Sequence, residues 1–201
     1  MRTAIQTIKQ EHQSIAAVLH GLRYLVDEVR AGRSQADFTV LFAMLRYIQE
    51  FPDRLHHPQE ETYLFRFLRQ RDPGSGALLD ELEQEHRKNE VVRDELVRAL
   101  ASYHGGSAAG LEAFSDVLEQ YTGLQWAHMR TEEDRVIPAA EKVLTEDDWK
   151  AIGDAFSSNR DPLVGVEVAR EYRELFRRIV NLAPPPIGVG PPAATGPGAS
   201  G

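Results

Sequence analysis

The sequence contains no cysteine among its 201 residues. This absence excludes disulfide bonds, thiolate zinc sites, iron–sulfur clusters held by cysteine and a cysteine nucleophile. A basic surface is also missing, because 31 acidic residues outnumber 23 basic residues and the formal net charge is −8. Nucleic-acid binding, which requires a basic face, is therefore not expected.

Long apolar runs are absent as well. The sequence has no apolar segment of eighteen residues, and residues 1–6 do not resemble a signal peptide. We therefore expect a cytoplasmic protein without a membrane segment. The hydrophobic content of 42% over 201 residues is sufficient for one globular domain with a sizeable core.

Apolar residues recur every three or four positions in four long segments, which predicts four core-facing helices. We expect these helices at residues 3–30, 36–70, 77–103 and 109–143. Pro52 and Pro58 lie inside the second helix and predict a kink or a break. The kink either interrupts the helix or directs His56 into the interior, and the sequence leaves both readings open. Four long helices with short connections predict an all-α fold, an antiparallel up-down-up-down four-helix bundle.

The region after the fourth helix has a different composition. Thr145 followed by acidic residues predicts a helix start, and the short helix carries Trp149 and Phe156. A further helix is expected after Pro162, and residues 183–201 consist mainly of Pro, Gly, Ala and Ser, which predicts a flexible tail. We therefore divide the chain into a bundle at 1–144, a helical extension at 145–182 and a tail at 183–201.

One short motif is repeated in the second and fourth predicted helices. His56 is followed by Glu60, and His128 is followed by Glu132, with 72 residues between the two copies. On an α-helix, positions i and i+4 share a face roughly 6 Å apart along the axis, so an imidazole and a carboxylate at this spacing can bind one cation. The His-x3-Glu spacing occurs four times, whereas 7 His and 19 Glu predict about 0.7 occurrences by chance.

The first and third helices carry a second repeat. The tripeptide Gln-Glu-His occurs at 10–12 and at 84–86, and both His12 and His86 lie on the apolar stripe of their helices. The chain is therefore a helical hairpin repeated with offsets of 74 and 72 residues. In such a bundle, inward side chains from all four helices can meet.

Six inward residues form the predicted metal site. They are His12, His56, Glu60, His86, His128 and Glu132. Burying such groups without partners is costly, and divalent cations remove that cost. The set divides evenly into two ions, each with two imidazoles and a shared pair of bridging glutamates, which leaves open positions for water, oxygen or peroxide. Mixed imidazole and carboxylate ligands without sulfur suit iron or manganese, and zinc as an alternative.

The adjacent pair His57 and Glu61 has the same spacing as His56 and Glu60. It is rotated by about 100° around the helix, so we expect only one of the two pairs to face the ions. Matching the repeats favours His56, which leaves His57 beside the site or at the surface.

Other polar residues receive structural or outer roles. Glu11 and Glu85 are expected on solvated faces, and Glu61 and Glu133 at the surface or just outside the ligands. His20 and His104 have no carboxylate at i+4 and are expected to be structural or exposed. Tyr121 lies one heptad before His128 and is expected in the core.

The order His, His-x3-Glu, His, His-x3-Glu resembles the hemerythrin-like family, the HHE cation-binding bundles, over residues 5–143. This resemblance implies a non-haem di-iron centre in an antiparallel four-helix bundle, with the six residues named above as its ligands. Residues 148–149 and 159–163 also resemble an extension found in bacterial members.

The sequence departs from the oxygen-carrying members of that family in two places. Those members have a second His one turn after the third-helix His, where this chain has Glu90. They also end the fourth-helix motif with an acidic residue five places after its His, which here is Glu133. Helical geometry favours Glu132, because position i+5 lies about 140° around the axis. The departures argue against simple oxygen carriage.

The leading hypothesis is a di-iron protein that senses or transforms a small oxidant, namely oxygen, peroxide or nitric oxide. Two equally ligated ions would also predict rapid oxidation of the diferrous form. An iron-dependent interaction module is an alternative, with a protein partner at the C-terminal helices, and a dinuclear zinc hydrolase is another. No general base is visible beyond the ligands, so the sequence does not decide whether the protein is an enzyme.

Overall fold

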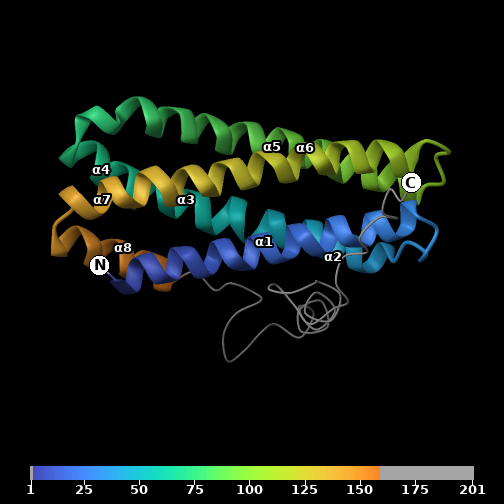
Figure 1. The fold of residues 1–201 in the computed structure, drawn as a ribbon, viewed down its shortest axis with the longest axis horizontal. Coiled ribbons are helices and arrows are strands. Elements are labelled where there is room, and N and C mark those ends of the chain that lie inside the picture. Colours follow the sequence, from blue (N-terminus) through green and yellow to red (C-terminus); the bar gives the residue numbers. More distant parts are fainter. Residues whose placement is uncertain (1, 159–201) are drawn as a thin grey trace, which may run out of the picture.

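A computed structural model describes residues 2–158, and within this range the chain forms helices and loops without a β-strand (Figure 1). The predicted all-α fold is confirmed. The helix expected after Pro162 and the tail at 183–201 lie outside the described residues, so these assignments and the three-part division stay predictions. Within residues 2–158, no helix is long and apolar enough to cross a membrane.

Four rods, each a helix or a row of helical segments, form the bundle. The first rod is α1, Arg2–Arg30. The second joins α2 Phe38–Glu50, η1 Pro52–His56, α3 His57–Gln59, η2 Glu60–Phe65 and α4 Arg66–Arg71. The short η3, Pro73–Ser75, leads to the third rod, α5 Gly76–His104. The fourth joins α6 Gly110–Thr131, η4 Glu132–Val136 and α7 Ile137–Val143, and α8 Glu146–Ser157 follows it.

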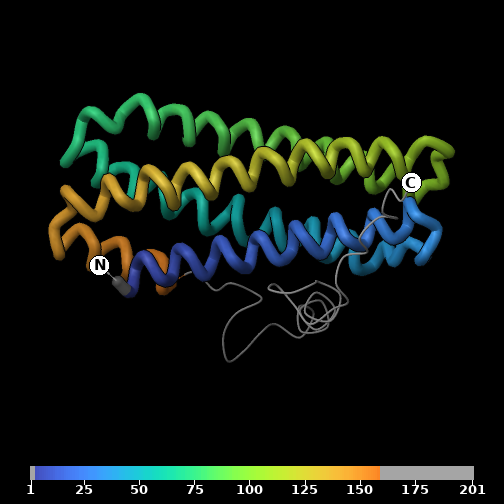
Figure 2. Tube along the Cα trace, viewed as in Figure 1, coloured from blue at the N-terminus to red at the C-terminus, as the bar shows by residue number. Residues whose placement is uncertain are grey.

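The rods run antiparallel, because the chain reverses its direction at each connection (Figure 1). The third and fourth rods lie side by side through α5 and α6. Figure 2 shows the start of α1 beside α8, and these two helices pack against each other. This arrangement brings one face of every rod to a common interior.

The second and fourth rods change helical pitch at the predicted metal motifs. The segments η1, η2 and η4 are π-helical. In η1 the amide of His56 donates to the carbonyl of Phe51, five residues earlier, at 3.1 Å. Pro52 has no amide hydrogen, and the wider π turn accommodates the distortion that an internal proline causes. The disturbance expected at Pro52 thus takes the form of a π segment, a feature frequent at functional sites, and Pro58 lies in the short α3 between η1 and η2.

The core consists of two apolar clusters on either side of a polar layer. One cluster includes Ile15, Met44, Leu96 and Phe114, and the other includes Ile8, Leu64, Leu82 and Ile137. On the first three rods, the predicted metal-site residues fall between the stretches that supply these two clusters, and on the fourth rod Met129 of the first cluster lies between His128 and Glu132. The apolar clusters therefore fix the position of the polar residues between them.

Helix α8 covers α1 with a buried apolar face that includes Trp149 and Phe156. Its start is a capping box, in which the Thr145 hydroxyl accepts from the amide of Asp148 at 3.2 Å. The Asp148 carboxylate accepts from the amide of Thr145 at 2.9 Å and from Arg71 Nε of α4 at 3.0 Å. The hydrogen bond from Arg71 is the largest of the interactions that lower the pKa of Asp148 to about 2. Asp148 therefore joins α8 to the end of the second rod.

Replacing Asp148 with alanine should lower the free energy of unfolding by about 1 to 2 kcal/mol at neutral pH, because a capping interaction and an ion pair are lost. The folded-state pKa is depressed below 3.8, so this stabilisation is present at higher pH and disappears as the pH falls through about 2. Urea denaturation followed by tryptophan fluorescence measures the difference. The exposed neighbour Asp147 provides the matched control, Asp147→Ala. Equal losses in both variants would contradict the proposed role of Asp148.

Candidate metal centre

Two overlapping groups of His and Glu side chains meet in the polar layer of the bundle. One group is His12, His56, Glu60 and Glu132, and the other is His57, Glu60, His86 and His128. Within each group the candidate ligand atoms lie within 4.8 Å of one another. None of these seven residues is more than 4% exposed. The structure therefore brings together all six residues that the sequence predicts, and adds His57.

Glu60 lies between the two groups of imidazoles. Its Oε1 atom is 3.1 Å from His56 Nε2 and 3.6 Å from His12 Nε2. Its Oε2 atom is 3.6 Å from His86 Nε2. One carboxylate oxygen thus faces each group, which is the arrangement required of a bridging ligand.

Glu132 repeats this arrangement from the fourth rod. Its Oε2 atom is 3.3 Å from His12 Nε2, and its Oε1 atom is 3.3 Å from His128 Nε2. The two carboxylates therefore share the space between the imidazole groups, and each is suited to bridge two cations.

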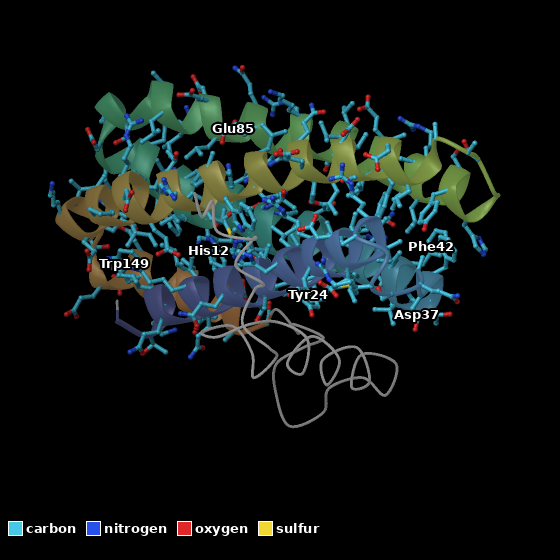
Figure 3. All side chains as sticks on the ribbon, turned by 45° about the vertical axis from the view of Figure 1, so that its right-hand side comes forward. His12, Tyr24, Asp37, Phe42, Glu85 and Trp149 are labelled. Atoms are coloured by element: carbon cyan, nitrogen blue, oxygen red, sulfur yellow. The ribbon has the colours of Figure 1, made fainter. Side chains whose placement is uncertain are left out.

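Every imidazole of the centre also faces a carboxylate at its Nδ1 atom. The pairs are His12 with Glu133 at 3.0 Å, His56 with Glu11 at 2.7 Å, His86 with Glu61 at 2.8 Å, and His128 with Glu85 at 2.8 Å. His57 Nδ1 faces Asp53 Oδ1 at a longer distance of 3.6 Å. A carboxylate at Nδ1 fixes the tautomer and leaves the Nε2 lone pair for a metal. Figure 3 labels one imidazole of the centre, His12 on α1. It also labels Glu85 on α5, one of the four carboxylates in the closest Nδ1 contacts, which we call the outer carboxylates.

The outer carboxylates follow the hairpin repeat. Glu11 and Glu85, each one residue before a predicted ligand, bind the His of the next rod along the chain. Glu61 and Glu133 bind an imidazole of the other hairpin. The expectation of a solvated face is therefore wrong for Glu11, which is buried, whereas the Glu85 side chain is 33% exposed while it contacts His128.

His57 breaks the symmetry of the centre. The residue 72 positions later is Met129, and the residue that corresponds to Asp53 is Gln125. The first hairpin thus supplies one imidazole more than the second. Three imidazoles surround one side of the centre and two surround the other. The even division expected from the sequence does not hold in the structure.

The expectation that His57 lies beside the site or at the surface is also wrong, and the reason is geometric. Consecutive residues differ by about 100° around a helix, but the inward sector of a bundle helix is itself about 100° wide. His56 and His57 therefore both point inward, one to each group, with ring centroids 5.7 Å apart. The ring of His57 also stacks on that of His86 at 4.2 Å.

Four other candidate residues stay outside both groups. They are Glu90, Tyr121, His20 and His104. Glu90 and His104 are exposed. Tyr121 is buried, and its hydroxyl accepts a hydrogen bond from Gln125 at 3.0 Å. His20 is exposed, and its ring packs on Trp126 with centroids 4.6 Å apart.

A groove of about 540 Å³ reaches the centre from one side. It runs between α1 and the fourth rod, and His12 and Met129 are among the residues that line it. None of the three imidazoles of the other group lines this groove. The groove therefore opens toward the side that has two imidazoles.

The donor atoms fit a pair of cations. All four carboxylate oxygens of Glu60 and Glu132, together with His12 Nε2, are buried without a hydrogen-bond partner in the described part of the chain. An unpaired buried polar atom costs roughly 1 to 3 kcal/mol, and a charged one costs more. The imidazole nitrogens 3.1 to 3.6 Å away do not meet hydrogen-bonding geometry. Cations between these atoms would satisfy them.

The contact between His86 and His128 also indicates that the centre is suited to bind cations. Their Nε2 atoms lie 2.8 Å apart, while both Nδ1 atoms face carboxylates. Two neutral rings that donate from Nδ1 would direct two lone pairs at each other, so a positive charge is required here, either a proton or a metal ion. Burial lowers the pKa of His128, but the charges of Glu132 and Glu85 outweigh burial and raise it to about 10.

One known protein family matches most of the chain. Residues 3–140 match the Hemerythrin HHE cation binding domain. The chain belongs to the hemerythrin family. The match confirms the resemblance expected from the motif, and it includes all seven residues of the centre. No curated protein and no solved structure gives a significant match to the chain. The family is thus one of cation-binding domains, and this member has a buried cluster of His and Glu side chains that fits cations.

Metal uptake by this hemerythrin domain should release protons and become tighter as the pH rises from neutral to about 10. Burial lowers the pKa values of His56 and His128, but nearby carboxylates raise them to about 9 and about 10. These imidazoles carry protons at pH 7 in the absence of metal, and a metal ion must displace them. Titration calorimetry with Mn(II) in two buffers of different ionisation enthalpy measures the protons released.

The control for this measurement is His20→Ala, which removes an imidazole outside the centre and should leave proton release unchanged. Metal uptake at neutral pH without proton release would contradict the assignment of these imidazoles to the hemerythrin centre.

Proposed function

We propose that the hemerythrin domain holds two iron ions and binds a small oxidant, such as oxygen, peroxide or nitric oxide, at the ion between His12 and His56. The observation that carries this proposal is the unequal supply of imidazoles, three on one side and two on the other. A position with fewer protein ligands keeps room for an exogenous ligand. His12, one of the two imidazoles on that side, also lines the groove.

The donor types support iron as the resident metal. The centre offers imidazole nitrogens and carboxylate oxygens, and the chain has no cysteine to provide a soft ligand. Such a set suits iron, while manganese and zinc also accept it. When bound, two iron ions supply electrons and a coordination position for the oxidant.

Apolar side chains shield the imidazoles from water away from the groove. The ring of Phe65 is nearly parallel to that of His86, with centroids 6.0 Å apart. The rings of Phe51 and Phe156 lie 6.3 and 5.8 Å from that of His56. Because Phe156 belongs to α8, this helix helps to enclose the centre. A dry environment strengthens the electrostatic interactions between the carboxylates and bound cations.

The outer carboxylates hold the imidazoles in the orientation that metal binding requires. Each of the four closest pairs directs Nε2 toward the centre through a contact of 2.7 to 3.0 Å at Nδ1. Loss of such an outer partner typically lowers metal affinity by about 10- to 100-fold. These residues thus position the ligands without touching the metal themselves.

Anaerobic reconstitution with Fe(II), followed by exposure to air, tests the proposal. We expect two iron ions per chain and an absorption spectrum that changes when azide is added. Fewer than one iron per chain, or a spectrum that azide does not alter, would count against it. A zinc hydrolase would give a colourless centre, so the same spectrum separates that alternative. The interaction-module alternative rests on the helix expected after Pro162, which lies outside the described residues.

A further inference from the structure

The groove beside His12 is larger than a diatomic ligand requires. Its volume is about 540 Å³. A water-sized molecule occupies about 30 Å³, whereas pockets for organic ligands span roughly 300 to 1,000 Å³. From His12 to His20 the groove follows α1 for eight residues, which corresponds to about 12 Å along the helix axis. The space accommodates a ligand with an organic body of several carbon atoms.

The groove has polar as well as apolar walls. Gln13, Arg130, Glu133 and Asp134 line it together with the side chains that would contact an organic group. Ala16 leaves space one turn after His12, and Trp126 and Met129 face α1 from α6. The indole of Trp126 contacts the ring of His20, with centroids 4.6 Å apart, and the guanidinium of Arg23, 5.3 Å from the ring centroid. These contacts fix the indole, and the part of it that lines the groove can pack against an aromatic or branched alkyl group.

One residue of the groove belongs to the metal centre. His12 lines the groove, and its Nε2 atom is buried among the unsatisfied ligand atoms of the centre. A ligand that fills the groove must therefore join an apolar body to a small group able to reach the metal position. Oxygen, nitric oxide and hydrogen peroxide can bind at a metal, but they lack an organic group that would fill the groove.

We propose that the groove takes an organic hydroperoxide, with its peroxide group at His12 and its organic body against Ala16 and Trp126. This inference rests on the proposed function, because it requires an oxidant to bind at the ion between His12 and His56. In one turnover the O–O bond of the hydroperoxide would break on uptake of two electrons and two protons, to give one alcohol and one water. Two ferrous ions held by the centre would supply the electrons and become ferric, and solvent would supply the protons.

The experiment compares cumene hydroperoxide with hydrogen peroxide in single-turnover oxidation of the anaerobic diferrous protein. The unmodified chain should react at least about tenfold faster with cumene hydroperoxide at equal concentration, since an apolar pocket contributes about that factor for a matching group. Ala16→Phe should slow this reaction by about tenfold or more and leave oxidation by hydrogen peroxide within about twofold. Trp126→Ala should also slow the reaction with cumene hydroperoxide selectively. This variant replaces Ala16→Phe in the test if Ala16→Phe does not fold.

The matched control is Ala127→Phe, which places the same ring on an exposed position of α6 and should change neither rate. A second readout does not depend on turnover: cumyl alcohol should quench tryptophan fluorescence of the iron-loaded chain with saturation, and this quenching should be lost in Ala16→Phe. Azide binding, measured in each variant, reports whether the metal position itself is intact.

Two results would overturn the hydroperoxide assignment while the proposed function stands. One is equal or faster oxidation by hydrogen peroxide in the unmodified chain, and the other is an equal slowing of both oxidants by Ala16→Phe. Failure of azide and of both peroxides to act on the iron-loaded chain would instead refute the proposed function, and the hydroperoxide inference with it.

Discussion

Replacing Met129 with histidine should close the open side of the metal centre and weaken azide binding by about 100-fold or more. Met129 occupies the position that corresponds to His57 in the repeated hairpin, 72 residues later. It follows His128 directly and lines the groove beside His12. A new imidazole here would face the group that has two imidazoles, and it would occupy the coordination position that the oxidant is proposed to use.

The surroundings of Met129 already contain a partner for the new ring. Gln125 lies four residues earlier, as Asp53 does relative to His57, and its Oε1 atom is buried without a hydrogen-bond partner among the described residues. This oxygen can accept a hydrogen bond from the Nδ1 of the introduced imidazole. The substitution therefore copies the arrangement of the first hairpin into the second.

Met129→Leu is the matched control, because it conserves volume and apolar character without offering a ligand. Azide titrations followed by absorbance should give unchanged affinity in Met129→Leu and a large loss in Met129→His, with two iron ions retained in both. Unaltered azide affinity in the histidine variant would show that the open position does not lie beside Met129.

Replacing Glu60 with glutamine should reduce the metal content to less than one ion per chain. Glu60 presents one oxygen to each group of imidazoles, and an amide provides neither the charge nor the second anionic oxygen of a bridge. Its carboxylate also offsets the mutual repulsion of two cations held in one buried site. The loss should therefore affect both ions rather than one.

Glu61→Gln provides the comparison at the adjacent residue. Glu61 binds His86 Nδ1 from outside the centre, so its amide variant should keep both metal positions with affinity lower by about 10- to 100-fold. His20→Ala and His104→Ala should retain full metal content. Metal analysis after iron reconstitution separates these classes, and equal metal content in Glu60→Gln and Glu61→Gln would refute the bridging role.

Much of the fold follows from local patterns in the sequence. Apolar periodicity predicts the four rods to within a few residues, and Thr145 with its acidic neighbours predicts the start of α8. The π-helical character of η1, η2 and η4 was not predicted. A π turn differs from an α turn by one residue, and Pro52 indicates only that the α-helical pattern is disturbed.

The six predicted site residues all belong to the two repeated motifs, and this repetition makes them predictable from the sequence. The outer carboxylates escape such reasoning because their partners lie far away in the chain, as for Glu11 and His56 with 45 residues between them. The Gln-Glu-His repeat nevertheless contained a usable signal, since Glu11 and Glu85 hold equivalent positions in the two hairpins.

His57 could have been recognised by comparison of the two hairpins. Asp53 precedes it by four residues, so a carboxylate and an imidazole share one helix face there, whereas the second hairpin has Gln125 and Met129. The inequality changes one functional expectation. The sequence predicts rapid oxidation of the diferrous form from two equally ligated ions, and the unequal groups of imidazoles do not support that premise.

The most direct measurement is a crystal structure of the iron-loaded chain with azide, with the iron positions located by anomalous scattering. We expect two iron ions bridged by Glu60 and Glu132, with azide bound to the ion held by His12 and His56, on the side of the groove. Azide on the ion surrounded by His57, His86 and His128, or a single iron in the cluster, would contradict it.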